Sequence, residues 1–191
     1  METRSRIVLL MHPKEYKRQR TGTGRLACIN LANSEIIPGI ALDERPRIRE
    51  LLDDAGNASY LLYPSPGAVD LGEREGSMRL AEELGGKSLV VFLVDSTWAC
   101  SRAVLRESPR IASLPRLQFK PQAKSRWVIK RQPRDYCLAT IEAIHELLCA
   151  LEIAGLDSYP DKERLLEAFA AMQEYQVEKA RTQGRPRVRN P

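Results

Sequence analysis

This chain of 191 residues lacks several patterns whose absence argues against whole classes of protein. It has only four cysteines and two histidines, with no C-x-x-C pair. We therefore expect neither a zinc site built from local ligand pairs nor a disulfide scaffold. The cysteines fit buried apolar positions in a reducing compartment.

Long apolar runs are also missing. No run reaches the ~18 residues that a membrane helix needs, so no membrane span is expected. The first apolar stretch, Ile7–Met11, is too short for a secretory signal, which favours a cytoplasmic protein. The segment Thr21–Arg25 has two glycines but not the P-loop pattern G-x-x-x-x-G-K-[ST], and it predicts only a turn.

Acidic residues are absent from residues 110–134, which contain eight lysines and arginines and so carry a charge of +8. The whole chain carries only +5, because acidic stretches separate this segment from two other basic ones. Residues 1–30 carry +5 and residues 181–191 carry +4, whereas residues 31–109 and 135–180 carry −5 and −7. Segregated positive charge is typical of a phosphate-binding face, although solvated side chains on loops give the same pattern.

Short apolar runs predict the strands, and apolar residues at helical spacing between them predict the helices. The predicted strands are Ile7–Met11, Arg25–Asn30, Ser59–Tyr63, Ser88–Val94 and Arg126–Lys130. The predicted helices are Arg45–Asp54, capped by Asp43, then Thr97–Arg106, Thr140–Ile153 and Pro160–Arg181. Strands alternating with helices indicate an α/β domain with a mostly parallel sheet.

We expect one domain over residues 1–181 and a basic, flexible tail over residues 182–191. Residues 108–126 contain three prolines and fit neither a strand nor a helix. An irregular connection of that length in a compact domain is usually functional.

The segment Asp95-Ser96-Thr97-Trp98 follows the most apolar predicted strand and is the strongest local indication of a site. Open α/β sheets bind ligands at the carboxyl ends of their strands, where this segment places a carboxylate, two hydroxyls and an indole. The structural alternative is that Asp95 or Ser96 caps the next helix and that Trp98 packs in the core.

Two further segments carry polar groups suited to a site. In Ser125–Arg134, cations flank Trp127, which suits RNA phosphates and an unpaired base. Alternatively, Trp127 and Ile129 point into the core from a strand and the cations are solvated. In Cys137–Ala143, amides at a helix start would hold a carboxylate or a ribose hydroxyl, unless Thr140, with Glu142 or Asp135, simply caps that helix.

Taken in chain order, these motifs resemble the DTW-domain family of tRNA-uridine aminocarboxypropyltransferases. The matching motifs are His12-Pro13-x-Glu15, Leu61-Leu62-Tyr63-Pro64, Asp95-x-Thr97-Trp98, Leu114-Pro115, Ser125-Arg126-Trp127-x-Ile129-x-Arg131-Gln132-Pro133 and Leu138-x-Thr140-x-Glu142-Ala143. They extend over about residues 7–155. Many members carry a cysteine-rich, metal-binding stretch before the first motif. The eleven residues before His12 contain no cysteine, so we expect neither this module nor a metal.

The resemblance implies a SPOUT-like fold in which a C-terminal trefoil knot, over residues 108–140, holds S-adenosylmethionine. It also implies transfer of the 3-amino-3-carboxypropyl group of S-adenosylmethionine to N3 of a tRNA uridine, with release of methylthioadenosine. The implied catalytic residues are Asp95, Thr97 and Trp98. The implied S-adenosylmethionine-binding residues are Leu62, Tyr63, Pro64, Leu114, Tyr136, Leu138 and Thr140. The implied RNA-binding residues are Arg126, Lys130, Arg131 and Arg134.

These roles fit the chemistry of the reaction. Uridine N3 is a poor nucleophile while protonated, so Asp95 would either accept its proton or orient the base. Trp98 would stack on uridine or face the sulfonium. Two alternatives stay open, a SPOUT-type RNA methyltransferase and a non-catalytic RNA-binding protein. The sequence leaves the oligomeric state open.

Overall fold

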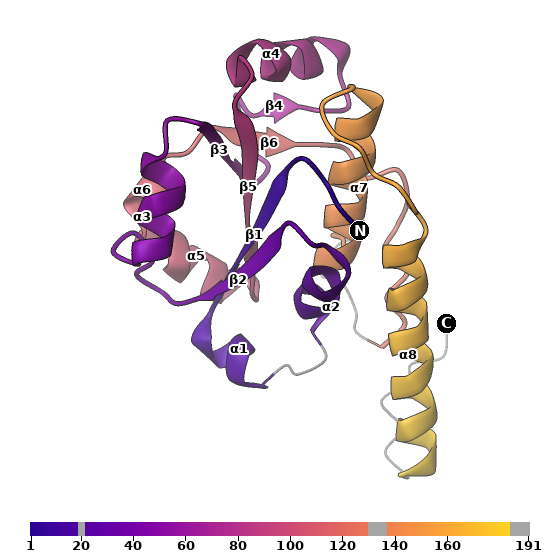
Figure 1. Ribbon diagram of the computed structural model, residues 1–191. Coiled ribbons are helices and arrows are strands. Elements are labelled where there is room, and N and C mark those ends of the chain that lie inside the picture. The colour runs from indigo at the N-terminus through magenta and orange to yellow at the C-terminus, as the bar shows by residue number, and fades with distance from the viewer. Residues whose placement is uncertain (19–21, 130–136, 184–191) are drawn as a thin grey trace.

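The computed structural model describes residues 1–18, 22–129 and 137–183. In these residues six strands form one sheet in the order β2-β1-β5-β3-β6-β4, and each pair of neighbouring strands is parallel (Figure 1). Their bounds are β1 Arg6–Met11, β2 Ser34–Pro38, β3 Asn57–Leu62, β4 Val69–Asp70, β5 Ser88–Asp95 and β6 Arg116–Gln118. The predicted α/β class with a parallel sheet is therefore confirmed.

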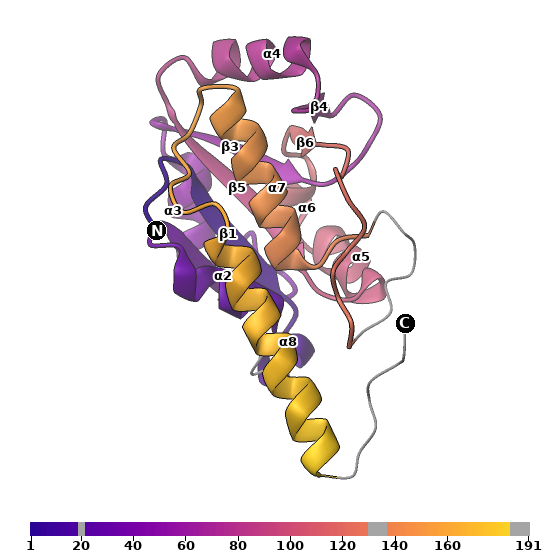
Figure 2. The same ribbon diagram turned by 90° about the vertical axis from the view of Figure 1, so that its right-hand side faces the viewer.

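Helices cover both faces of the sheet. The helices are α1 Pro13–Arg18, α2 Thr23–Asn30, α3 Pro46–Asp53, α4 Arg74–Leu84, α5 Trp98–Arg106, α6 Pro109–Ala112, α7 Thr140–Ile153 and α8 Arg164–Thr182. Figure 1 shows α3, α5 and α6 on one side of the strands and α2, α7 and α8 on the other. In Figure 2, α7 and α8 lie next to each other, and the C-terminal half of α8 extends past the other elements.

Successive residues of the central strands contribute to different core clusters. Ile7 and Leu9 of β1 pack in the cluster that includes α7 and α8, whereas Val8 and Leu10 pack in the cluster that includes α3 and α6. Because side chains alternate across a strand, a strand that is apolar at every position is buried on both faces. The continuous apolar run predicted for β5 has this cause.

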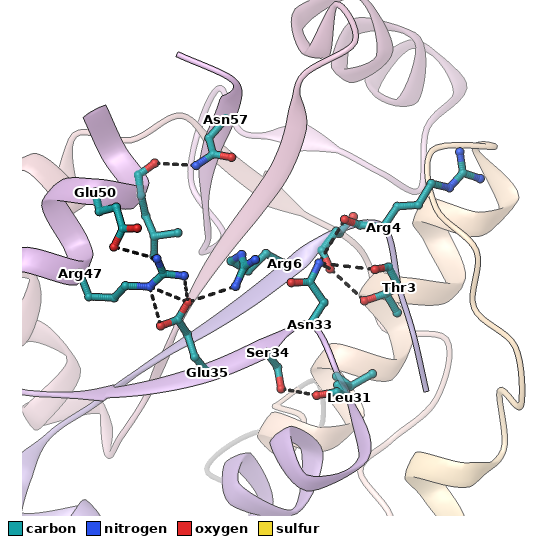
Figure 3. Close-up of polar contacts among 12 residues, drawn as sticks. Thr3, Arg4, Arg6, Leu31, Asn33, Ser34, Glu35, Arg47, Glu50 and Asn57 are labelled. Carbon is teal, nitrogen blue, oxygen red and sulfur yellow. Dashed lines mark hydrogen bonds and ion pairs between the residues drawn. The ribbon is translucent and has the colours of Figure 1, made fainter. Parts of the chain in front are cut away.

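Polar contacts hold the sheet edge at the amino ends of β1 and β2, away from the carboxyl ends (Figure 3). Glu35 on β2 accepts hydrogen bonds from Arg47 on α3 at 2.8 Å and from Arg6 on β1 at 3.4 Å. These side chains are partly exposed, so each ion pair contributes at most about 1 kcal/mol. Their effect is to fix α3 against the edge strand.

Two strand predictions are wrong. Residues Arg25–Asn30 belong to α2, which packs against α7 and α8, so the helical packing partner overrides the short apolar run. The described part of Arg126–Lys130 is irregular, because its backbone N–H groups bond to side chains instead of a neighbouring strand. The segment 108–126, expected to be irregular throughout, contains α6 and β6.

Two helix starts also differ from the prediction. Asp43 does not cap α3; its carboxylate accepts the backbone N–H groups of Arg110 at 2.7 Å and Ile111 at 3.3 Å, at the start of α6. The last helix begins at Arg164 instead of Pro160, because Asp161 has a positive φ of 54° that a continuous helix does not allow.

Part of the sequence prediction lies outside the described residues. The expected knot, residues 108–140, includes residues 130–136, and most of the expected tail is residues 184–191. The single-domain boundary at residue 181 stays a prediction. Among the helices that the structure describes, none is both long and apolar enough to cross a membrane.

Candidate functional site

A cavity of about 780 Å³ lies at the carboxyl ends of the strands. That volume is within the range of about 300–1,000 Å³ typical of small-molecule sites. Residues that follow or end β1, β3, β4, β5 and β6 line it, together with the start of α7 and the α1–α2 region. The topology therefore places a cavity where parallel sheets usually bind their ligands.

The D-x-T-W and L-x-T-x-E-A motifs meet inside this cavity. Asp95 is the last residue of β5 and Thr140 is the first residue of α7, and both line the cavity. The Thr140 hydroxyl donates a hydrogen bond to Asp95 Oδ1 at 2.7 Å. Asp95 therefore does not cap α5; Thr97 is at that N-cap position, and no side chain hydrogen bond caps the helix.

Gly24 of α2 lies against the second oxygen of the same carboxylate. A Cβ placed on Gly24 would lie 2.0 Å from Asp95 Oδ2 and 2.8 Å from Asp95 Cγ. Real Cβ atoms never approach an oxygen so closely, so a side chain at position 24 would displace Asp95. Residues Thr23–Arg25, interpreted from the sequence as part of a turn, instead begin α2, and Gly24 there supplies the close approach that glycine alone permits.

The first motif, His12-Pro13-x-Glu15, holds the start of α1 next to β5. The backbone N–H of His12 donates to Ser96 Oγ at 3.1 Å, so Ser96 joins the ends of β1 and β5 instead of capping α5. His12 Nδ1 accepts the backbone N–H of Lys14 at 3.1 Å, which puts the proton of a neutral ring on Nε2. His12 is buried, whereas Glu15 lines the cavity.

Glu142 connects the start of α7 with the loop before it. Its buried carboxylate accepts hydrogen bonds from the Ser125 hydroxyl and the Arg126 backbone N–H, each at 2.6 Å, and from the Ala139 backbone N–H at 2.8 Å. Only the Glu142 part of the capping alternative is therefore confirmed: Glu142 bonds to the N-cap residue Ala139, whereas Thr140 does not cap the helix and donates its hydroxyl hydrogen bond to Asp95. The same carboxylate also satisfies two donors of the 125–126 loop.

Gln173 on α8 holds the other side of that loop. Its Oε1 accepts the Val128 backbone N–H at 2.7 Å, and its Nε2 donates to the Arg126 carbonyl at 3.2 Å. Between these contacts, Trp127 packs edge to face on Phe169 of α8, with ring centroids 5.7 Å apart. Trp127 also lines the cavity, so its packing on Phe169 connects α8 to one wall of the cavity.

The structure brings most of the described candidate residues together. Those that line the cavity are Asp95, Thr97, Leu62, Tyr63, Pro64, Leu138 and Thr140. Leu114 lies elsewhere, because it packs against the core cluster that contains Val8 and Ile111. Arg126 is exposed. The candidates Lys130, Arg131, Arg134 and Tyr136 lie outside the described residues, as does the side chain of Trp98.

Several cavity residues were missing from the sequence-based candidates. Asp70 at the end of β4 lines the cavity and accepts hydrogen bonds from Gly72 N at 2.9 Å and Gln118 Nε2 at 3.1 Å. Phe119 and Lys120 follow β6 and line it too. Glu15 and Trp127 belong to two of the family motifs and could have been named as site residues from the sequence. Asp70, Phe119 and Lys120 could not, because β4 and β6 are too short to leave a sequence pattern.

The thiol of Cys28 on α2 lies within electrostatic reach of Asp95. Burial raises the pKa of the Cys28 thiol on α2, a hydrogen bond with Ser34 opposes this, and the negative charge of Asp95 adds to it. Cys28 is therefore a neutral thiol at neutral pH. Within the described ranges, no group of three or more His, Cys, Asp or Glu side chains could hold a metal ion.

The family of this chain follows from its match to a known domain. The model of the DTW domain matches residues 1–177. The chain belongs to the DTW-domain family. This DTW domain is 30% identical over 152 residues to tRNA-uridine aminocarboxypropyltransferase 2 of Drosophila melanogaster. The matched region is 78% of this chain and 57% of that protein.

Two mammalian relatives carry the same name. The Macaca fascicularis protein is 24% identical over 175 residues, 90% of this chain and 55% of that protein. The Mus musculus protein is 22% identical over 153 residues, 80% of this chain and 49% of that protein. The DTW domain thus spans about half the length of the curated relatives it matches. No solved structure matches it.

Proposed function

We propose that this DTW domain transfers the 3-amino-3-carboxypropyl group of S-adenosylmethionine to N3 of a tRNA uridine. The observation that carries the proposal is the hydrogen bond between Thr140 and Asp95, which joins the two most specific family motifs inside one cavity. The names of the three relatives agree with this activity.

The cavity residues suit S-adenosylmethionine as the donor. Apolar side chains of Leu62, Pro64 and Leu138 line the wall and suit an adenosine. Carboxylates of Glu15, Asp70 and Asp95 line the same space and suit a sulfonium and an ammonium group. Arg116 lies over one face of the Tyr63 ring, 5.2 Å from its centroid. The bound donor supplies an electrophilic γ-carbon next to a positively charged sulfur.

Asp95 holds the uridine N3–H in the proposed reaction and accepts its proton. A bond forms between N3 and the γ-carbon while the bond from that carbon to sulfur breaks, and sulfur keeps the electron pair. The leaving group, methylthioadenosine, is neutral. The chemistry therefore depends mainly on alignment, and Thr140 and Gly24 supply it by fixing the Asp95 carboxylate.

The knot and the RNA contacts are part of the same proposal. Residues Phe119–Pro121 and Cys137–Thr140 line one cavity although the chain between them is long, as expected for a segment folded back around a bound donor. We assign Arg126, Lys130, Arg131 and Arg134 to tRNA phosphates and Trp98 to the uridine or the sulfonium. Residues 110–134 contain no acidic residue and carry a charge of +8, which supports the assignment to RNA phosphates.

The test is mass analysis of tRNA nucleosides after incubation with the protein and S-adenosylmethionine. The proposal predicts aminocarboxypropyl-uridine in the tRNA and methylthioadenosine in solution. Asp95→Asn should lower turnover about 100-fold or more, with tRNA binding kept, because a positioned base contributes about 10²–10⁴-fold. Methylated tRNA with S-adenosylhomocysteine would instead identify a methyltransferase, and normal turnover by Asp95→Asn would exclude the role given to Asp95.

A further inference from the structure

Helix α1 carries part of the N-terminal basic block to the rim of the cavity. Glu15 of α1 lines the cavity, and so do Gly22 and Thr23 just beyond the helix. Lys14 and Lys17 are exposed on the same helix, three residues apart and therefore on one side of it. Two exposed cations thus stand on the same short helix as the cavity residue Glu15.

The position of α1 relative to Asp95 is fixed by His12. The His12 carbonyl accepts the backbone N–H groups of Glu15 at 2.9 Å and Tyr16 at 3.0 Å, and its ring accepts that of Lys14. The His12 N–H in turn donates to Ser96, the residue after Asp95. The lysines of α1 are therefore held by backbone contacts that lead directly to the proposed reaction centre.

An aromatic ring lies between these lysines in the sequence. Tyr16 is 38% exposed, and the guanidinium of Arg25 stacks over its ring at 4.3 Å from the centroid. Arg25 also donates a hydrogen bond to the Tyr16 carbonyl at 2.7 Å, which holds the pair together. An exposed ring held in place by a cation is an arrangement with which proteins stack unpaired bases.

A second basic segment reaches the same cavity. Lys120 is exposed and lines the cavity, and the exposed residues Lys124 and Arg126 follow it. The carboxylates of Glu15, Asp70 and Asp95 line the cavity itself. A polyanion can therefore contact the basic residues outside, whereas the carboxylates disfavour its phosphates inside the cavity and accept an uncharged group of the same ligand. A uridine within an RNA has both properties.

We propose that α1 is a second RNA-binding segment, in which Lys14 and Lys17 contact phosphates and Tyr16 stacks on a base next to the target uridine. The RNA is then held on the rim by residues 14–17 and by residues 120–126, with the uridine inserted between its two contacts. This inference rests on the proposed function, because it takes an RNA uridine as the acceptor.

The test compares the double variant Lys14→Gln/Lys17→Gln with Lys87→Gln. Lys87 is an exposed lysine just before β5, at the end of the strand opposite Asp95. Each lost phosphate contact lowers the slope of log affinity against log salt by about 0.7–0.9. We expect the double variant to lose about 1.5 units of slope and roughly tenfold in tRNA affinity at 0.1 M salt, while Lys87→Gln behaves like the wild type.

Three results would overturn the inference. The first is a double variant whose salt slope equals that of the wild type. The second is a Lys87→Gln variant whose salt slope falls as much as that of the double variant. The third is polyglutamate that displaces bound tRNA as effectively as unlabelled tRNA does. Tyr16→Leu should weaken tRNA binding about tenfold without changing the salt slope, because stacking does not release counterions. If Tyr16→Leu binds tRNA as tightly as the wild type, Tyr16 does not stack on a base. Release of methylthioadenosine by the wild type is measured separately. If the wild type releases none while the double variant has an altered salt slope, the proposed function is refuted and the RNA-binding role of α1 is not.

Discussion

Thr140 at the start of α7 donates its hydroxyl hydrogen bond to Asp95 at the end of β5, 45 residues earlier in the chain. The oxygen-to-oxygen distance is 2.7 Å. On the other side of the carboxylate stands Gly24 of α2, whose missing side chain leaves the space that Asp95 Oδ2 occupies. Three segments far apart in the sequence therefore determine the position of one carboxylate.

Replacing Thr140 by valine removes the hydroxyl and keeps the shape of the side chain. A hydrogen bond to a charged group contributes about 1.5–3 kcal/mol, so kcat should fall about 10- to 100-fold through the misplaced carboxylate. Thr140→Ser keeps the donor and should retain most of the activity. Steady-state kinetics with tRNA separates the two variants, and equal rates for valine and serine would contradict the role given to this hydrogen bond.

Replacing Gly24 by alanine should lower turnover about 100-fold although alanine favours helices. A helical glycine-to-alanine change ordinarily stabilises a protein by up to about 1 kcal/mol. Here the new Cβ meets Asp95 Oδ2, and a misplacement of about 1 Å can cost 100-fold in rate. The kinetic measurement is paired with thermal unfolding in wild-type and Asp95→Ala backgrounds. A loss of stability that is the same in both backgrounds would show that Asp95 is not the group displaced.

Replacing Glu142 by glutamine should destabilise the fold by about 1–3 kcal/mol. The amide NH₂ would face donors, because Ser125 and Ala139 both donate to Oε2 and Arg126 donates to Oε1. Urea unfolding measures the change, with Glu174→Gln as the control because Glu174 is exposed. Equal midpoints for the two variants would show that Glu142 does not hold the loop.

Replacing Gln173 by alanine should act on the cavity from a distance. The substitution leaves Val128 N–H and Arg126 C=O without their partner and loosens the loop that carries Trp127 into the cavity wall. We expect the KM for S-adenosylmethionine to rise about tenfold, the equivalent of one lost hydrogen bond of roughly 1.4 kcal/mol. Glu174→Ala, one residue along α8, should leave the KM unchanged. A normal KM in Gln173→Ala would restrict α8 to a structural role.

The central strands β1 and β5 and the helix α7 were predictable because local pattern decides their residues, whereas β2 and α4 were not among the predictions. β1 and β5 consist of consecutive apolar residues, as burial on both faces requires, and α7 has the bounds that its apolar stripe and capping residues predicted. The short strands β4 and β6 were not predictable, because two or three residues carry no period.

Partners distant in the sequence explain the remaining errors. Residues 25–30 are apolar enough for a strand, and only their packing on α7 and α8 makes them helical. Trp127 had two interpretations, an RNA contact or a core position, and the structure places it against Phe169 and in the lining of the cavity. Its surroundings come from α7 and α8, at positions that no local spacing reveals. The same holds for Gly24, whose importance depends on Asp95.

The central claim is that the aminocarboxypropyl group, and not the methyl group, leaves the donor in this cavity. The direct measurement uses S-adenosylmethionine labelled separately in the methyl carbon and in the aminocarboxypropyl chain, incubated with tRNA and protein. We predict that the RNA takes up the aminocarboxypropyl label and that the methyl label stays in methylthioadenosine. Methyl label in the RNA, with the other label in S-adenosylhomocysteine, would contradict the account.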